Sequence, residues 1–117
     1  MGPRLLIVDD NPDFRRFAAQ LLEDDGYEVV GTAEDASGAL AATCEFSPEV
    51  VLLDVGLPDA SGFEVAASLA RERPSTAVLL TSTHDCRDFE QLALQSGARG
   101  FVPKDELCGA ALDRLLM

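Results

Sequence analysis

Acidic side chains follow two of the apolar runs in this sequence. Asp9 and Asp10 come directly after residues 5–8, and Asp54 follows residues 50–53. Carboxylates held close together repel one another, which raises their pKa values unless a cation lies between them. A cluster of oxygen ligands with room for water suits Mg²⁺ or Mn²⁺. If the fold joins the two acidic segments, we therefore expect a divalent-cation site.

A hydroxyl and a lone lysine follow two further apolar runs. Ser82 and Thr83 come close behind residues 77–80, and Lys104, the only lysine of the chain, follows residues 100–102. A lysine is a compact cation on a flexible stem and suits a phosphate. A carboxylate nucleophile, metal-binding acids, a hydroxyl and a cation are the groups that in-line phosphoryl transfer to Asp54 requires. Since no glycine-rich nucleotide loop is present, the phosphoryl donor must arrive already activated.

Each of these residues also has a purely structural interpretation. Asp9 and Asp10 would favour the start of the next helix through its dipole. A strand-end hydroxyl such as that of Ser82 often bonds to nearby backbone, and an isolated lysine is usually solvated. Asp54 favours the functional interpretation, because it follows a buried strand at the same edge.

Apolar runs alternate with amphipathic segments along the whole chain, which predicts a strand–helix unit repeated five times. The expected strands are residues 5–8, 28–31, 50–53, 77–80 and 100–102, and the helix start signals are Pro12, Asp35, Ser61 with Glu64, Asp85 and Glu106. The first, third and fourth strands are apolar on both faces, as in parallel sheets covered by helices. Right-handed crossovers then give a doubly wound α/β sheet. Ligands bind at the carboxyl ends of such strands, where all the candidate residues lie.

The composition fits a single domain over residues 1–117, with 47% hydrophobic residues and a formal net charge of −12. This charge disfavours binding to nucleic acid or to anionic membranes. No apolar run approaches the roughly 20 residues of a membrane helix, and residues 5–8 are too few for a signal peptide. Cys44, Cys86 and Cys108 are widely spaced and His84 is the only histidine, which disfavours disulfides and zinc. We expect a cytoplasmic protein.

Three segments resemble the receiver domain of bacterial two-component response regulators. They are residues 5–11 (LLIVDDN), 51–62 (VLLDVGLPDASG) and 97–104 (GARGFVPK), and the likeness covers essentially the whole chain. It implies a CheY-like, flavodoxin-like (βα)5 fold with strand order 2-1-3-4-5, and a phosphoprotein of phosphorelay signal transduction. Lys104 is followed by Asp105 instead of proline, which resembles receivers that precede helix-turn-helix output domains of the LuxR/NarL type.

The resemblance also implies roles for individual residues. Asp54 is the phosphoacceptor of a signalling domain that assists its own phosphorylation and dephosphorylation without being an enzyme. Asp10, Asp54 and the backbone carbonyl of Gly56 bind Mg²⁺ directly, and Asp9 acts mainly through water. Lys104 balances charge on the phosphoryl oxygens.

A switch pair follows from the same resemblance. The switch hydroxyl lies fifteen residues before Gly97, which selects Ser82 over Thr81 and Thr83, and the switch aromatic is Phe101. In the family the hydroxyl moves toward the phosphoryl group and the aromatic turns inward. The surface of the fourth helix, fifth strand and fifth helix then changes. Simple sheet packing is the other interpretation of Phe101.

The chain departs from the common family pattern around the acceptor. Thr83 stands where a small residue is usual, Gly56 offers no side chain over the site, and His84 is close enough in sequence to reach it. We expect an unusual phosphoryl lifetime, without a predicted direction. Thr83 also supports one alternative, a receiver-like interaction domain that works without phosphorylation.

A phosphohydrolase of the haloacid dehalogenase type is the third hypothesis, because that class uses similar groups. It needs Asp-x-Asp after the first strand, however, and this chain has Asp9 and Asn11 at that spacing and no cap domain. The implied partners are a sensor histidine kinase or a phosphotransfer protein, with a possible homodimer through the fourth helix, fifth strand and fifth helix. Arg15 and Arg16 form a candidate kinase-docking face, for which a solvated surface is the alternative.

Overall fold

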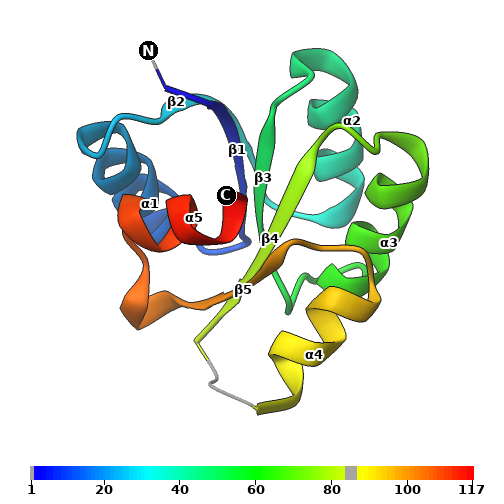
Figure 1. Cartoon of the computed structure of the whole chain (residues 1–117). Coiled ribbons are helices and arrows are strands. Elements are labelled where there is room, and N and C mark those ends of the chain that lie inside the picture. The colour runs from blue at the N-terminus through cyan, green and yellow to red at the C-terminus, as the bar shows by residue number, and fades with distance from the viewer. Residues whose placement is uncertain (1, 84–86) are drawn as a thin grey trace.

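A computed structural model of the chain describes residues 2–83 and 87–117, in which strands and helices alternate (Figure 1). The elements are β1 (Arg4–Val8), α1 (Pro12–Asp24), β2 (Glu28–Ala33), α2 (Ala36–Phe46), β3 (Val50–Asp54), α3 (Gly62–Glu72), β4 (Ala77–Ser82), α4 (Arg87–Gln95), β5 (Gly100–Pro103), a 3₁₀ turn (Lys104–Glu106) and α5 (Gly109–Leu116). The predicted fivefold repeat of strand and helix is therefore confirmed.

The strands form one parallel sheet in the order β2-β1-β3-β4-β5, as expected. Strands β3 and β4 are buried along their whole length, because helices cover both faces of the sheet. The register places Asp54 beside Thr81 and Ser82 beside Pro103. The carboxyl ends of β3, β4 and β5 therefore reach the same edge.

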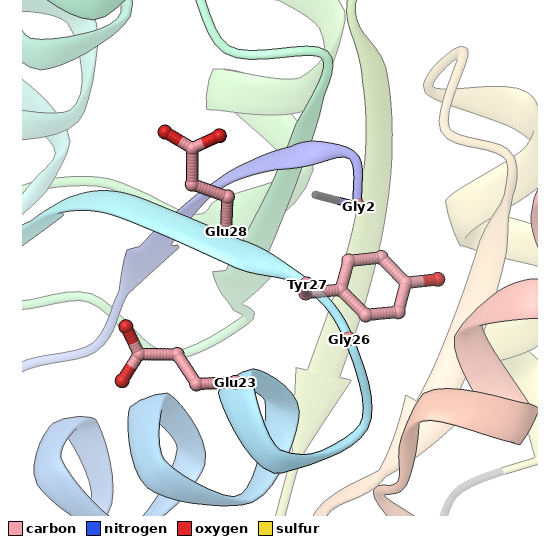
Figure 2. A pocket seen from close by; sticks show the side chains of 5 residues that line it. All are labelled: Gly2, Glu23, Gly26, Tyr27 and Glu28. Atoms are coloured by element: carbon pink, nitrogen blue, oxygen red, sulfur yellow. The ribbon is translucent and has the colours of Figure 1, made fainter.

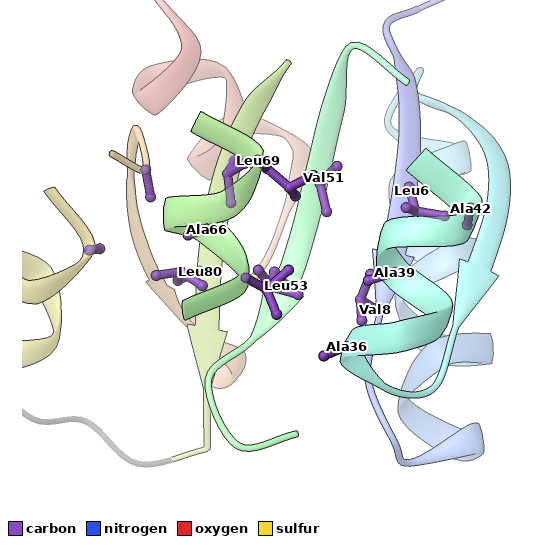
Figure 3. Packing of buried hydrophobic residues seen from close by; sticks show 14 residues of the cluster. Leu6, Val8, Ala36, Ala39, Ala42, Val51, Leu53, Ala66, Leu69 and Leu80 are labelled. Carbon is purple, nitrogen blue, oxygen red and sulfur yellow. The ribbon is translucent and has the colours of Figure 1, made fainter. Parts of the chain in front are cut away.

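Two hydrophobic clusters hold the layers together. One packs α1 and α5 against one face of the sheet, and the other packs α2, α3 and α4 against the opposite face (Figures 1 and 3). Alternate residues of each central strand supply the two clusters: Leu5 and Ile7 belong to the cluster with α1 and α5, and Leu6 and Val8 belong to the cluster with α2, α3 and α4. Full burial of such a side chain contributes on the order of 1.5–3 kcal/mol, so the strands that carry the candidate residues are firmly anchored.

The inner face of α2 is formed by small side chains. Asp35 caps this helix as predicted, since its Oδ1 accepts the N–H of Gly38 at 2.6 Å. Leu40 and Cys44, however, are exposed. The buried face consists instead of small residues: Ala36, Ala39, Ala42 and Thr43. Small side chains let α2 approach the sheet closely.

The last helix starts later than the predicted residue 106. It begins at Gly109, whose N–H donates to Oδ2 of Asp25 at 2.7 Å. This cap comes from the turn after α1, which a local sequence pattern does not indicate. At α3, Ser61 caps through the N–H of Phe63 at 3.1 Å, and the reciprocal bond expected with Glu64 is not seen. The predicted cap Asp85 lies outside the described residues.

Within residues 2–83 and 87–117, none of the helices is both long enough and apolar enough to cross a membrane.

Candidate functional site

The carboxylates that follow β1 and β3 meet at the carboxyl edge of the sheet. Oxygen atoms of Asp9, Asp10 and Asp54 all lie within 4.8 Å of one another. Asp9 and Asp54 are buried and Asp10 is exposed. The convergence follows from the pairing of β1 with β3, which brings the ends of the two strands side by side.

Asp9 is held in place by three separate contacts. Its Oδ1 accepts the N–H of Asn11 at 2.9 Å, and its backbone carbonyl accepts a 2.6 Å hydrogen bond from Nη1 of Arg15. Its buried Oδ2 lies 2.6 Å from Nζ of Lys104. This last contact is an ion pair. Oδ2 has no well-aligned hydrogen bond among the described residues. The Asp9 side chain is thus held in one position at the site.

The side-chain cap of α1 is supplied by neither of the first two acids. The N-cap of α1 is Asn11, whose Oδ1 accepts the N–H groups of Asp13 at 2.9 Å and Phe14 at 3.3 Å. Because Asn11 caps α1, the carboxylates of Asp9 and Asp10 are left for the cluster.

Lys104 is not a solvated surface lysine, because its side chain is only 14% exposed. Its Nζ lies 3.5 Å from Oδ1 of Asp54, in addition to the closer contact with Asp9. Three carboxylates and one ammonium carry a formal charge of −2 (three negative charges and one positive). That excess and the oxygen-only donor set fit one divalent cation of the Mg²⁺ type.

The pKa of the Asp54 carboxyl is raised above its usual value. Burial is the main cause, and the negative charge of Asp9 adds to it, whereas Lys104 partly counteracts both. The side chain nevertheless keeps 10% of its surface exposed. The Asp54 carboxylate is therefore accessible from the open edge of the sheet.

The loop after β3 leaves the space beside Asp54 open. Gly56 forms an isolated bridge with Ser61, and a Cβ added at Gly56 would lie 3.8 Å from Oδ2 of Asp54. A Cβ at Gly62 would lie 2.4 Å from the Asp54 carbonyl oxygen, a severe clash. Gly62 therefore lets α3 start directly against the backbone of Asp54, a role that sequence analysis did not assign.

The three hydroxyl residues after Leu80 differ in their surroundings. Thr81 is wholly buried, and its Oγ1 donates a 2.6 Å hydrogen bond to the carbonyl of Val102, which joins β4 to β5. Ser82, the predicted switch hydroxyl, is 6% exposed at the end of β4, and Thr83 is exposed. His84 lies outside the described residues. The burial of Thr81 is consistent with the choice of Ser82.

Phe101 belongs to a chain of aromatic contacts that sequence analysis missed. Its ring centroid lies 5.5 Å from that of Phe89 on α4, which lies 5.7 Å from that of Phe63 on α3. Both pairs have the edge-to-face arrangement that aromatic rings favour. The predicted switch aromatic is thereby linked to α3 and α4.

Asp59 ties the loop after β3 to α2. Its two carboxylate oxygens accept the N–H groups of Ala36 at 2.8 Å and Ser37 at 3.1 Å. These hydrogen bonds to the charged form lower the pKa of Asp59. The segment that follows Asp54 is thus anchored to a neighbouring helix.

The arginines proposed for kinase docking have different surroundings. The guanidinium of Arg15 donates a hydrogen bond to the backbone carbonyl of Asp9, so this side chain helps to hold the site residue Asp9 in place. Arg16 forms a 2.5 Å pair with Asp13 in which both side chains are largely exposed. Of the two, only Arg16 has the exposure that a docking surface needs.

A hollow at the opposite edge of the sheet lacks the candidate chemistry. It is lined by Gly2, Glu23, Gly26, Tyr27 and Glu28, which lie next to the amino ends of β1 and β2 (Figure 2). The acid, hydroxyl and lysine groups all gather at the other edge.

Comparison with known proteins identifies the family of the chain. The model of the family described as "Response regulator receiver domain" matches residues 5–113. The chain is 39% identical over 115 residues to "Probable transcriptional regulatory protein NarL" of Mycobacterium tuberculosis, covering 94% of this chain and 53% of that protein. It is 36% identical over 94 residues to a "Protein-glutamate methylesterase/protein-glutamine glutaminase" of Halobacterium salinarum, covering 80% and 27%.

A solved structure gives the same result for the fold. The signal receiver domain of the response regulator NarL of Mycobacterium tuberculosis superposes with a TM-score of 0.88 at 38% identity, covering 98% of this chain and 97% of that one. The expected CheY-like, flavodoxin-like fold is confirmed. The chain spans about half or less of the curated relatives it matches.

Proposed function

We propose, from the premise that this chain belongs to the family of response regulator receiver domains, that it accepts a phosphoryl group on Asp54 within a two-component system. The donor is the phosphohistidine of a sensor histidine kinase or of a phosphotransfer protein. The observation that carries the proposal is the placement of Asp54 at the end of a central strand. Its reachable carboxylate has Asp9 and Asp10 beside it and an ammonium 3.5 Å away.

The carboxylate of Asp54 acts as the nucleophile. One of its oxygens attacks the phosphorus atom in line with the leaving imidazole. The phosphorus–nitrogen bond breaks with its electron pair remaining on the donor nitrogen, and an acyl phosphate forms on Asp54. Water later attacks the same phosphorus atom, which releases inorganic phosphate and restores the carboxylate.

The donor set of the site fits Mg²⁺ or Mn²⁺. Asp10, Asp54 and the backbone carbonyl of Gly56 would hold the ion directly. Asp9 would act through water, because its two carboxylate oxygens already contact the N–H of Asn11 and the Lys104 ammonium. When bound, the ion supplies positive charge beside the phosphoryl oxygens.

Lys104 and Ser82 support the phosphoryl group from the protein side. The Lys104 ammonium is already 3.5 Å from Oδ1 of Asp54, so a short movement brings it to a phosphoryl oxygen. Ser82 lies at the adjoining end of β4 and donates its hydroxyl proton to another of these oxygens. The contacts of Lys104 and Ser82 with phosphoryl oxygens form only when Asp54 is phosphorylated. They therefore stabilise the phosphorylated state relative to the unphosphorylated one.

Movement of Ser82 is transmitted to the surface formed by α4, β5 and α5. Phe101 turns inward behind the hydroxyl, which changes its contact with Phe89 on α4. Thr83 and Gly56 flank the acceptor and set how readily a donor or water reaches it. The altered surface binds a downstream target or a second copy of the chain.

The kinase or phosphotransfer protein docks beside the acceptor, on the α1 face that carries Arg16. The module works in the cytoplasm, and its high negative charge keeps the domain itself off nucleic acid. The relatives of similar fold include a transcriptional regulator, so control of transcription is the output proposed for the whole protein.

Intact mass after incubation with Mg²⁺ and acetyl phosphate tests the proposed acceptor. We expect wild type to gain one phosphoryl group in an acid-stable, base-labile form, and Asp54→Asn to gain none. Asp59→Asn is the matched control, because it removes a carboxylate from the same loop and should leave the gain intact.

Two outcomes would contradict the assignment. Equal gain in wild type and Asp54→Asn would place the acceptor elsewhere. If neither acetyl phosphate nor a panel of phosphorylated histidine kinases modified wild type, the receiver-like interaction domain that works without phosphorylation would replace the proposal.

A further inference from the structure

An aromatic ring from α1 covers one side of the Lys104 ammonium. Nζ of Lys104 lies 4.2 Å from the ring centroid of Phe14, within the range of a cation–π contact. The first turn of α1 is therefore in direct contact with the lysine that follows β5, and that lysine also lies beside Asp54.

Among residues 2–83 and 87–117, the ammonium contacts three groups of two kinds. Two are carboxylate oxygens, at 2.6 Å on Asp9 and at 3.5 Å on Asp54, and the third is the ring of Phe14. A carboxylate accepts hydrogen bonds from the ammonium, whereas the ring attracts its charge without a lone pair. The ring therefore holds the cation near the acceptor while its N–H groups stay available to oxygen.

We propose that Phe14 is a positioning residue for Lys104, which keeps the ammonium at the acceptor and thereby speeds phosphoryl transfer to Asp54. The transfer step rests on the function proposed above. The ring adds attraction for the ammonium that does not compete with phosphoryl oxygens. An acidic side chain at this position would instead bind the ammonium and withhold it.

The ring is itself well fixed. The N–H of Phe14 donates to the cap residue Asn11 at 3.3 Å, and the ring of Phe17 lies 6.4 Å away. The next residue, Arg15, bonds to the carbonyl of Asp9 at 2.6 Å, which fastens this turn of α1 to β1. Phe14 also packs against the cluster on the α1 side of the sheet. Simple core packing is thus the competing explanation, and the test must separate charge attraction from packing.

Fluorinated phenylalanines separate the two effects, because fluorine weakens the negative face of the ring with little change in size. We would insert mono-, di- and trifluorophenylalanine at position 14 and measure the rate of phosphorylation by acetyl phosphate at fixed Mg²⁺. We expect a stepwise fall in rate, a loss of about fivefold in Phe14→Leu, and retention in Phe14→Tyr. Phe17, the neighbouring ring at 57% exposure, is the matched control and should show no trend.

Nuclear magnetic resonance tests the contact without any phosphoryl transfer. Lys104 is the only lysine of the chain, so ¹³C-labelled lysine gives one unambiguous ε-methylene signal. The ring should shift its protons upfield in wild type and in Phe17→Leu, and Phe14→Leu should abolish that shift.

Either measurement can overturn the proposal. An ε-methylene signal at the unshifted position in folded wild type would show that the ring does not hold Lys104. If the phosphorylation rate stayed constant across the fluorinated series, the role of Phe14 would be core packing alone. If wild type shows the shift but accepts no phosphoryl group, the proposed function fails while the positioning of Lys104 stands.

Discussion

The ammonium of Lys104 lies 2.6 Å from a carboxylate oxygen of Asp9 that is wholly buried. Removal of one member of a buried ion pair leaves the other charge uncompensated. We expect Lys104→Met to lower the free energy of unfolding of the metal-free protein by about 3 kcal/mol. Denaturant titration measures the loss, and Asp9→Asn combined with Lys104→Met should recover part of it.

The exposed pair of Arg16 and Asp13 provides the contrast. Both side chains are more than 70% exposed, so water screens their attraction. Arg16→Met should change the stability by less than about 0.5 kcal/mol. Similar losses in Lys104→Met and Arg16→Met would mean that the pair with Asp9 is not a buried one.

The raised pKa of Asp54 predicts how stability depends on pH in the absence of metal. The folded state holds this proton more tightly than the unfolded state, so ionisation of Asp54 disfavours folding. Asp54→Asn should therefore unfold at a higher temperature than wild type at pH 7. The difference should shrink as the pH falls from the raised pKa of folded Asp54 towards the ordinary pKa of an aspartate, and it should vanish below the ordinary pKa, where both states are protonated.

Thermal unfolding between pH 3 and pH 7 in a chelator checks this prediction. Mg²⁺ should narrow the difference at pH 7, because it stabilises wild type more than Asp54→Asn. If Asp54→Asn were less stable than wild type at pH 7, or if the difference in stability did not change with pH, ionised Asp54 would not destabilise the folded state as proposed.

The sheet and the site edge could be predicted from the sequence for a physical reason. A strand such as β3, buried on both faces, must be apolar at every position, and such runs stand out from amphipathic helices. Once the strands are parallel, their carboxyl ends share one edge. The meeting of Asp9, Asp54 and Lys104 follows from that geometry alone.

Packing details and distant partners could not be predicted in the same way. The inner face of α2 is made of alanines such as Ala39, and the larger Leu40 points outward, so size is a poor guide to burial there. The cap that Asp25 provides for α5 joins residues far apart in the chain. The contact of Phe14 with Lys104 likewise exists only once α1 and β5 are docked.

The neighbours Thr81 and Ser82 should respond in opposite ways to loss of their hydroxyl groups. Thr81→Val removes the buried hydrogen bond to Val102, so its free energy of unfolding should fall by about 1–2 kcal/mol while phosphorylation persists. Ser82→Ala should still accept phosphoryl groups. In this variant, however, phosphorylation should no longer change hydrogen exchange in α4, β5 and α5. Hydrogen exchange with and without acetyl phosphate, alongside denaturation, measures both effects. The assignment of Ser82 fails if Thr81→Val is the variant that loses the exchange response.

The hydroxyl of Tyr27 donates a 2.6 Å hydrogen bond to Asp113 and so ties the start of β2 to α5. Burial, this bond and the charge of Asp113 all raise the pKa of Tyr27. We expect Tyr27→Phe to lower the free energy of unfolding by about 1–2 kcal/mol at pH 7. Asp113→Asn should cause a similar loss.

The same bond makes stability fall at alkaline pH. Because the folded state holds the phenolic proton more tightly, the contribution of Tyr27 is complete below the ordinary tyrosine pKa of about 10 and is lost as the pH rises above it. The chain has one tyrosine and no tryptophan, so absorbance reports this group alone. Folded wild type should ionise at higher pH than Asp113→Asn. Coincident titrations would show that the bond does not hold the phenol.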